Sequence, residues 1–164
     1  MFVMSRTIIF TLVLAFNAGS IWAQDFQKGF AAAQSGDYVT ALQGWRPLAE
    51  QGDVDAQYNL GVMYDNGWGV LQDYAEAMKW YRLAAEQGNA KAQHNIGLMY
   101  GNGYGVLQDN VRAHLWYNIA SANGYEEAGE WRDKTAFKMP PADISEAQST
   151  ARACMSSNYK NCGW

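Results

Sequence analysis

Apolar side chains recur along the chain at intervals of three and four residues, the spacing of one face of an α-helix. One such stripe comprises Ala56, Leu60, Met63 and Tyr64, and a second comprises Ala77, Trp80, Tyr81 and Ala84. Asp73 precedes the second stripe as a helix N-cap would, and Gly88 follows it as a helix-ending residue. The pattern therefore predicts two helices joined as a hairpin.

This hairpin is repeated. Residues 54–89 and 90–125 align without a gap and are identical at 18 of 36 positions, whereas chance would give about two or three. The same register extends upstream into residues 24–53 and downstream into 126–164, where the unit is shorter by two residues. Because a lone hairpin cannot bury both of its stripes, neighbouring hairpins must stack. The sequence thus predicts an all-α fold, an α/α solenoid of about four hairpins.

The repeated residues resemble a known family. The pattern Ala-x-x-Asn-Leu-Gly-x-x-Tyr-x-x-Gly-x-Gly-Val-x-x-Asp, then Ala-x-x-Trp-Tyr-x-x-Ala-Ala-x-x-Gly, occupies 56–88 and returns at 92–124 with Ile96 and Ser121 as departures. It resembles the Sel-1-like repeat, which is similar to the tetratricopeptide repeat but has a longer loop between its helices. The resemblance implies a right-handed superhelix that serves as an interaction scaffold, and it does not imply an enzyme. Residues 24–53 and 126–164 match only in part and are expected to form an N-terminal cap hairpin and a degenerate C-terminal repeat.

The first 23 residues have the features of a secretory signal peptide. Arg6 is their one ionisable side chain, and an apolar run from Ile8 to Phe16 follows it. Cleavage is expected between Ala23 and Gln24, with a second option after Ser20. The apolar run is too short for a membrane span. We therefore expect an exported protein, periplasmic or secreted, whose mature domain is 24–164.

The two cysteines follow the repeat register. Cys154 and Cys162 are separated by eight residues, as are Ala84 and Ala92 in one repeat and Ala120 and Ala128 in the next. This position should bring the end of one helix against the start of the following one, so two thiols there in an exported protein are expected to form a disulfide. Free reactive thiols are the alternative. The spacing also resembles the disulfide of the cysteine-rich Sel-1-like proteins.

Composition limits the chemistry. The formal charge is −4, with no basic stripe for a nucleic acid to bind. Two Cys and two His exclude zinc and iron–sulfur clusters almost by counting, so neither a metal nor a cofactor is predicted. His94 and His114 are interpreted as surface or groove residues without a catalytic partner.

The sequence also contains one motif that would suit a serine enzyme. The cysteine-rich relatives have been linked to penicillin binding and β-lactam hydrolysis, and Ser157 and Lys160 form a Ser-x-x-Lys string. Such a string is expected by chance about 0.3 times in this composition. It also falls inside the proposed disulfide loop. A weak β-lactam-binding or hydrolysing enzyme therefore stays the runner-up, and no catalytic residue is assigned.

Asn59 and Asn95 are the first candidates for binding, because they recur one repeat apart on the helix that lines the concave face in this architecture. An amide both donates and accepts, which suits an extended peptide backbone. The resemblance implies the same role, since the matching Asn of tetratricopeptide repeats contacts ligand peptides. Tyr58 and His94 should flank them. A structural hydrogen bond to a neighbouring helix is the alternative.

Trp68 and Tyr104 are the second candidates. Each lies between two loop glycines, and exposed aromatic residues often anchor partners. The alternative is that each ring folds back over its own hairpin. The sequence as a whole predicts a non-catalytic scaffold that binds a protein or peptide partner in the cell envelope, with cell-wall glycan binding through these aromatic residues as a further alternative.

Overall fold

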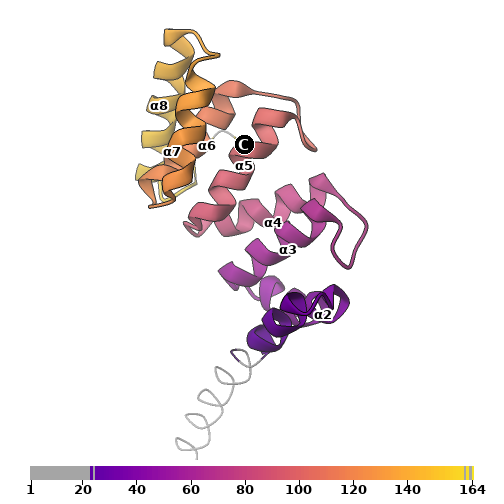
Figure 1. Ribbon diagram of the computed structural model, residues 1–164. Coiled ribbons are helices and arrows are strands. Elements are labelled where there is room, and N and C mark those ends of the chain that lie inside the picture. The colour runs from indigo at the N-terminus through magenta and orange to yellow at the C-terminus, as the bar shows by residue number, and fades with distance from the viewer. Residues whose placement is uncertain (1–22, 24, 161, 163) are drawn as a thin grey trace, which may run out of the picture.

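The chain forms a stack of helical hairpins along one axis. The computed structural model describes residues 23, 25–160, 162 and 164, and among these there is no strand. After a helix over 25–34 the chain forms α2 (Tyr38–Glu50), α3 (Val54–Asn66), α4 (Tyr74–Glu86), α5 (Ala90–Asn102), α6 (Asn110–Ala122), α7 (Glu126–Ala136) and α8 (Pro141–Ser156). Figure 1 shows the hairpins following one another from indigo to yellow. The predicted all-α solenoid is confirmed, although its fourth helix pair, α7 and α8, is not packed as a hairpin. The predicted signal peptide, apart from Ala23, lies outside the described residues.

Side-chain caps define where the repeat helices begin. Asp53 and Asn89 accept hydrogen bonds from the amides of Ala56 and Ala92, and so satisfy N–H groups that the first turn of α3 and of α5 leaves free. Asp73 caps α4 in the same way. A proline inside a helix usually bends or breaks it, but α2 continues to Glu50 with Pro47 inside its last turn.

Two mid-helix glycines allow the hairpins to close tightly. A Cβ built at Gly97 would lie 2.6 Å from two ring carbons of Tyr117, and one at Gly61 would overlap the ring of Tyr81 in the same way. Glycine at these positions costs about 1 kcal/mol of helix propensity. The close approach of a fully buried tyrosine from the second helix of each hairpin offsets that cost.

A ladder of side-chain amides links successive hairpins. The buried Gln57 donates to the carbonyl of Ala49 at 3.1 Å and accepts from Gln87 at 2.8 Å. One repeat later Gln93 donates to the carbonyl of Ala85 at 3.1 Å and accepts from Asn123 at 2.8 Å. Buried amides of this kind must be paired, so the ladder fixes how far each hairpin is rotated against the one before it.

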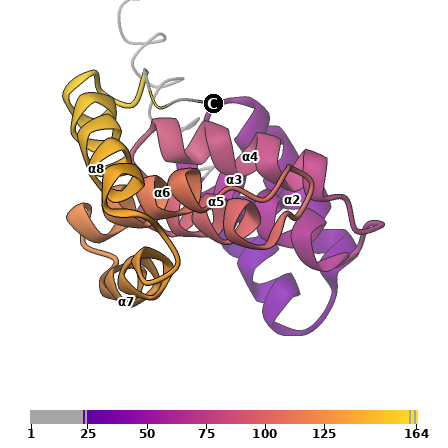
Figure 2. The same ribbon diagram turned by 90° about the horizontal axis from the view of Figure 1, so that it is seen from above.

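The last two helices depart from the repeat. Both α7 and α8 pack against α6, but they contact each other little, and Figure 2 shows them on different sides of α6. Pro141 occupies the first turn of α8, where its missing N–H costs no helical hydrogen bond. The C-terminal unit is therefore a splayed pair that covers the end of the stack.

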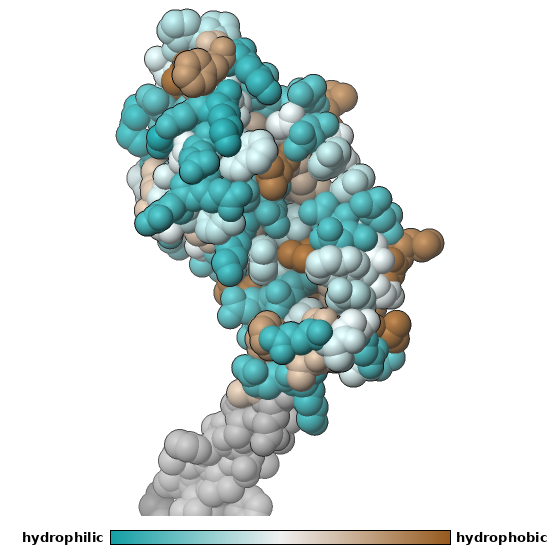
Figure 3. Space-filling model, in the orientation of Figure 1, coloured by the Kyte–Doolittle hydropathy of each residue, from teal (hydrophilic) through white to brown (hydrophobic). Residues whose placement is uncertain are grey.

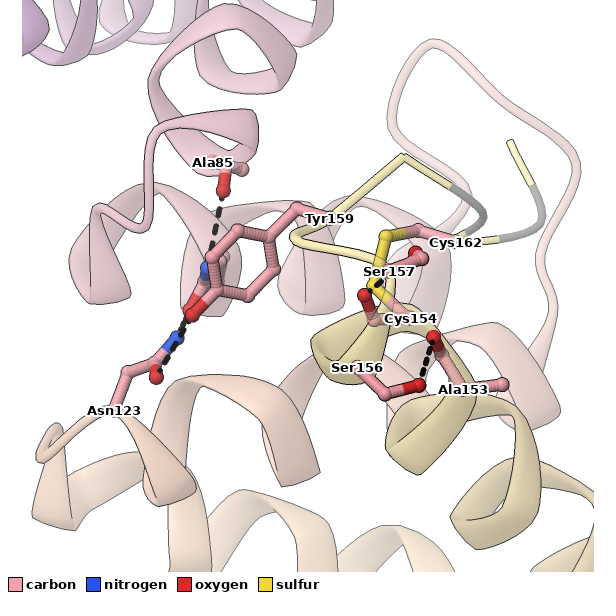
Figure 4. The surroundings of a disulfide bond; sticks show 9 residues. Ala85, Asn123, Ala153, Cys154, Ser156, Ser157, Tyr159 and Cys162 are labelled. Carbon is pink, nitrogen blue, oxygen red and sulfur yellow. Dashed lines mark hydrogen bonds between the residues drawn. A yellow bond between two sulfur atoms is a disulfide. The ribbon is translucent and has the colours of Figure 1, made fainter.

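The cysteines are paired, and their loop folds back onto the stack. Cys154 and Cys162 form a disulfide with a Cα–Cα distance of 4.6 Å, and both are fully buried, as are the four alanines that share their register. Beyond α8 the centroid of the Trp164 ring lies 4.5 Å from that of Trp116, and the guanidinium carbon of Arg82 lies 4.1 Å from the Trp164 centroid. Figure 4 shows the disulfide beside the amide ladder.

Candidate functional site

The first helices of the hairpins form a common face, and a groove of about 440 Å³ crosses it near their N-termini. We call it the first-helix groove. Its walls come from the helix over 25–34, from α3, from α5 and from the turn before α7. They are Phe26, Phe30, Asp55, Tyr58, Asn59, Asn89, Ala90, Lys91, Asn123, Gly124 and Tyr125. The lining is mixed, with aromatic rings, amides and one charge of each sign, as in sites that bind peptides.

A second, more apolar pocket adjoins this groove. It has a volume of about 310 Å³ and lies between the helix over 25–34 and the second half of α3. Its lining is Phe30, Ala33, Gln34, Tyr38, Trp45, Asn59, Val62, Met63 and Trp68. Phe30 and Asn59 belong to both cavities. This apolar slot and the first-helix groove therefore meet at Asn59.

The two candidate asparagines have different surroundings. The amide of Asn95 interacts with the hydroxyls of Tyr58 and Tyr81: burial raises the pKa of both phenols, and the hydrogen bond from Asn95 opposes that shift. The hydroxyl of Tyr81 in turn donates to Oδ2 of Asp65 at 3.1 Å, and burial raises the pKa of that carboxyl. Asn95 is thus part of a polar network between hairpins.

Asn59, by contrast, makes no side-chain hydrogen bond to another described residue. The position equivalent to Tyr81 in the preceding hairpin is Trp45, whose Nε1 donates to the carbonyl of Phe26 at 3.2 Å. Trp45 carries no hydroxyl, so Asn59 has no equivalent of the Tyr81 hydroxyl that Asn95 meets. The amide of Asn59 is available where the groove and the slot join.

Tyr58 and His94 occupy equivalent positions but different environments. Tyr58 is half-buried and lines the first-helix groove. His94 is only 4% exposed, and its ring is enclosed by Tyr117, Tyr125 and Trp131 at centroid distances of 5.4, 4.9 and 6.4 Å. The expectation that His94 and His114 lie at the surface or in the groove is wrong: both are buried, and burial lowers the pKa of each imidazole.

The loop aromatics stack on the preceding hairpin. The ring of Trp68 lies 4.9 Å from that of Tyr38 at an interplanar angle of 13°, and Tyr104 lies 5.0 Å from Tyr74 at 10°. Each ring therefore packs across a hairpin boundary rather than over its own hairpin, while 41% of Trp68 and 44% of Tyr104 stay exposed.

The same loops expose aliphatic side chains. Leu71 and Leu107, one repeat apart, are each 91% exposed. Figure 3 shows brown groups projecting along the edge where Figure 1 places the α3–α4 loop. This loop edge is a second, flatter surface with an apolar character.

The Ser-x-x-Lys string, Ser157 to Lys160, lies directly after α8. Ser157 follows α8 as its C-cap, and its Oγ donates to the carbonyl of Cys154 at 2.8 Å. It therefore lies at the C-terminal end of a helix, where no helix dipole would favour an alkoxide. Within the described ranges there is no cluster of three or more His, Cys, Asp or Glu suited to a metal ion. None of the described helices is long and apolar enough to cross a membrane.

Two stretches of the chain, 54–89 and 90–125, match the family model of the Sel1 repeat. The chain contains two Sel1 repeats. They coincide with the hairpins α3–α4 and α5–α6, which supply the centre of the first-helix groove. Sel1 repeats generally form scaffolds for protein–protein interaction.

Solved structures that resemble this one include two repeat proteins. One is c5321, a protective antigen present in uropathogenic Escherichia coli strains with the same repeat fold: 28% identity, TM-score 0.79, covering 84% of this chain and 31% of that one. The other is a Sel1 repeat protein from Oxalobacter formigenes: 34% identity, TM-score 0.60, covering 65% of this chain and 44% of that one. The chain thus spans less than half the length of either relative. No curated protein matches the chain.

Proposed function

We propose that this protein is a non-catalytic scaffold of the cell envelope that binds a protein or peptide partner through the concave, first-helix face. The signal-peptide features of residues 1–23 support export. The presence of Sel1 repeats supports the scaffold role. The relatives are longer than this chain, so their own activities are not transferred to it.

The observation that carries the proposal is the amide of Asn59 at the junction of the groove and the slot, which makes no hydrogen bond to another residue that the structure describes. A peptide backbone presents one N–H and one C=O per residue, and a side-chain amide can pair with both. Phe26 and Phe30 offer apolar surface beside it. A bound segment could therefore form backbone hydrogen bonds and bury side chains at the same place.

The test begins with a partner captured from isolated cell envelope on the mature 24–164 chain. Its affinity is then measured for wild type and for Asn59→Ala. Losing one hydrogen bond should weaken binding by about 0.5–1.5 kcal/mol, which is roughly threefold to tenfold. Because Asn59 has no partner within the described chain, the thermal midpoint should stay unchanged.

Asn95→Ala is the matched control. It removes the amide that meets the hydroxyls of Tyr58 and Tyr81, so it should lower the thermal midpoint. Its loss of affinity should be smaller than that of Asn59→Ala. A second control replaces Leu71 and Leu107, which lie on the loop edge outside both cavities, with Ala. If affinity survives Asn59→Ala but falls in this leucine double variant, the loop edge is the binding surface and the proposal fails.

A further inference from the structure

The second residue of α3, α5 and α7 carries a charge whose sign alternates along the stack. Asp55 in α3, Lys91 in α5 and Glu127 in α7 are separated by 36 residues each and hold equivalent positions. Asp55 and Lys91 both line the first-helix groove, and both are exposed. Neither takes part in any of the five ion pairs found in the described part of the chain.

Glu127 is already engaged. Its carboxylate accepts from the hydroxyl of Tyr125 at 2.9 Å and from Nε1 of Trp131 at 3.3 Å. These hydrogen bonds lower the pKa of Glu127. They also orient the carboxylate toward rings on its own element. The charges left to meet a ligand in the groove are therefore one negative, on α3, and one positive, on α5.

The spacing of these two charges suits an extended chain. Helices α3 and α5 contact each other directly, and packed helices are about 8–10 Å apart. An extended peptide rises about 3.3 Å per residue. A basic and an acidic side chain about three residues apart would therefore face Asp55 and Lys91 together.

The apolar slot fixes a third point. Asn59 follows Asp55 by four residues, one helical turn and about 6 Å along α3, and the slot opens at Asn59. An apolar side chain about two residues from the basic one would therefore reach the slot. Its walls are mainly aromatic and aliphatic, including Phe30, Val62 and Met63.

We propose that the first-helix groove selects extended peptide segments by charge pattern: an apolar residue, a basic residue about two positions away and an acidic residue about three positions further. The inference rests on the proposed function and names the chemistry of its partner. Charge complementarity sets the order, because exchanging the two charges would place like beside like at Asp55 and at Lys91.

The probe is a synthetic peptide, acetyl-Phe-Ser-Lys-Ser-Ser-Glu-Ser-amide, with a fluorescent label. It is compared with an isomer in which Lys and Glu are exchanged, and both are also made in reversed order, because the groove can be entered from either direction. Fluorescence anisotropy with the purified protein gives the four dissociation constants at low ionic strength. In the orientation that binds, the complementary isomer should bind at least fivefold more tightly than its exchanged counterpart. Raising the salt to 1 M should erase the difference, because screening then acts within about 3 Å.

The double variant Asp55→Lys with Lys91→Asp keeps the net charge and should reverse the preference. Both side chains are exposed, so the fold should be retained, as helical circular dichroism will verify. The matched control exchanges Glu76 and Lys79, an exposed ion pair on α4 outside both cavities, and should leave the preference as in wild type. Equal binding of the isomers, no binding of any of the four peptides at millimolar concentration, or no reversal in the double variant overturns the inference.

The envelope partner separates this inference from the function on which it rests. If that partner is weakened by Asn59→Ala but binds the charge-exchanged double variant as well as wild type, the scaffold role stands and selection by charge is overturned. A partner weakened by both changes supports the inference.

Discussion

The hydroxyl of Tyr159 donates a hydrogen bond to Oδ1 of Asn123 at 3.0 Å, so a residue in the disulfide loop terminates the amide ladder that begins at Gln57. Figure 4 shows the chain of contacts from Ala85 through Asn123 to Tyr159. Tyr159 adopts a positive φ of 62°, a conformation that non-glycine residues rarely take. The loop that Cys154 and Cys162 close therefore places this ring.

Removing the disulfide should destabilise the fold. For a loop of this length, separation eight, the chain-entropy model gives about 2.5 kcal/mol. We expect Cys154→Ala with Cys162→Ala to lower the free energy of unfolding by about that amount, and Tyr159→Phe to lower it by about 0.5–1.5 kcal/mol. Urea denaturation measures both. An unchanged midpoint for the cysteine double variant would mean that the loop is held without the bond.

Two tryptophans should differ in how much they contribute to the stability of the fold. Trp116 is fully buried beneath Trp164, whereas Trp68 is 41% exposed and stacks on a single ring. Trp116→Ala should cost about 3–5 kcal/mol of stability. Trp68→Ala should cost no more than about 1.5 kcal/mol. Thermal unfolding followed by circular dichroism checks this, and similar losses in the two variants would contradict the burial that we describe.

Two glycines of α5 offer a matched pair. A Cβ at Gly97 would clash with Tyr117 at 2.6 Å, but one at Gly101 would lie 3.5 Å from the hydroxyl of the same tyrosine, an ordinary contact. Gly97→Ala should therefore destabilise the protein by about 1–3 kcal/mol through overpacking. Gly101→Ala should be neutral or stabilising by up to about 1 kcal/mol. Denaturant midpoints of the two variants give the answer, and a stable Gly97→Ala would exclude close packing at that site.

The buried histidines should make stability depend on pH. Burial lowers the pKa of His94 and His114 below the value of 6.5 expected in the unfolded chain. As the pH falls through that value, the unfolded chain binds protons that the folded protein does not, so the free energy of unfolding decreases. The loss ends when the pH reaches the lowered pKa of the folded state.

The control for this effect is a double variant, His94→Phe with His114→Leu. Its stability should vary less with pH between about pH 7 and 5 than that of wild type. The raised pKa of Asp65 acts in the opposite sense, because its protonation favours the folded state as the pH falls. That contribution is common to both proteins and cancels in the difference. Parallel pH profiles for the two proteins would show that neither histidine is responsible.

Local features of the repeat could be predicted from the sequence. Caps such as Asp73, the tight approach at Gly97 and the pairing of Cys154 with Cys162 each depend on residues within one repeat period. The 36-residue identity was enough to place them. The peptide-binding face stays a prediction.

Contacts between hairpins could not be predicted in the same way. Asn59 and Asn95 are identical in the repeat, but their partners come from neighbouring hairpins that differ, with Trp45 at one position and Tyr81 at the next. His94 is enclosed in part by Tyr125 and Trp131, whose counterparts one repeat earlier are Asn89 and Asn95. The identity of Gln57 and Gln93 was a signal for the amide ladder, but it indicates a buried polar residue only once the stacking is known.

The first two hairpin boundaries are each fastened at both ends of their helices. Gln57 and Gln93 hold the end where α3 and α5 start, and the stacked pairs, such as Trp68 on Tyr38, hold the end where these helices finish. Two attachment points at opposite ends oppose twisting as well as separation, so the curvature of the array is set before any ligand arrives. A binding peptide would then lose its own freedom but would not have to reshape its host. We therefore expect the array to keep the same curvature with and without a bound peptide.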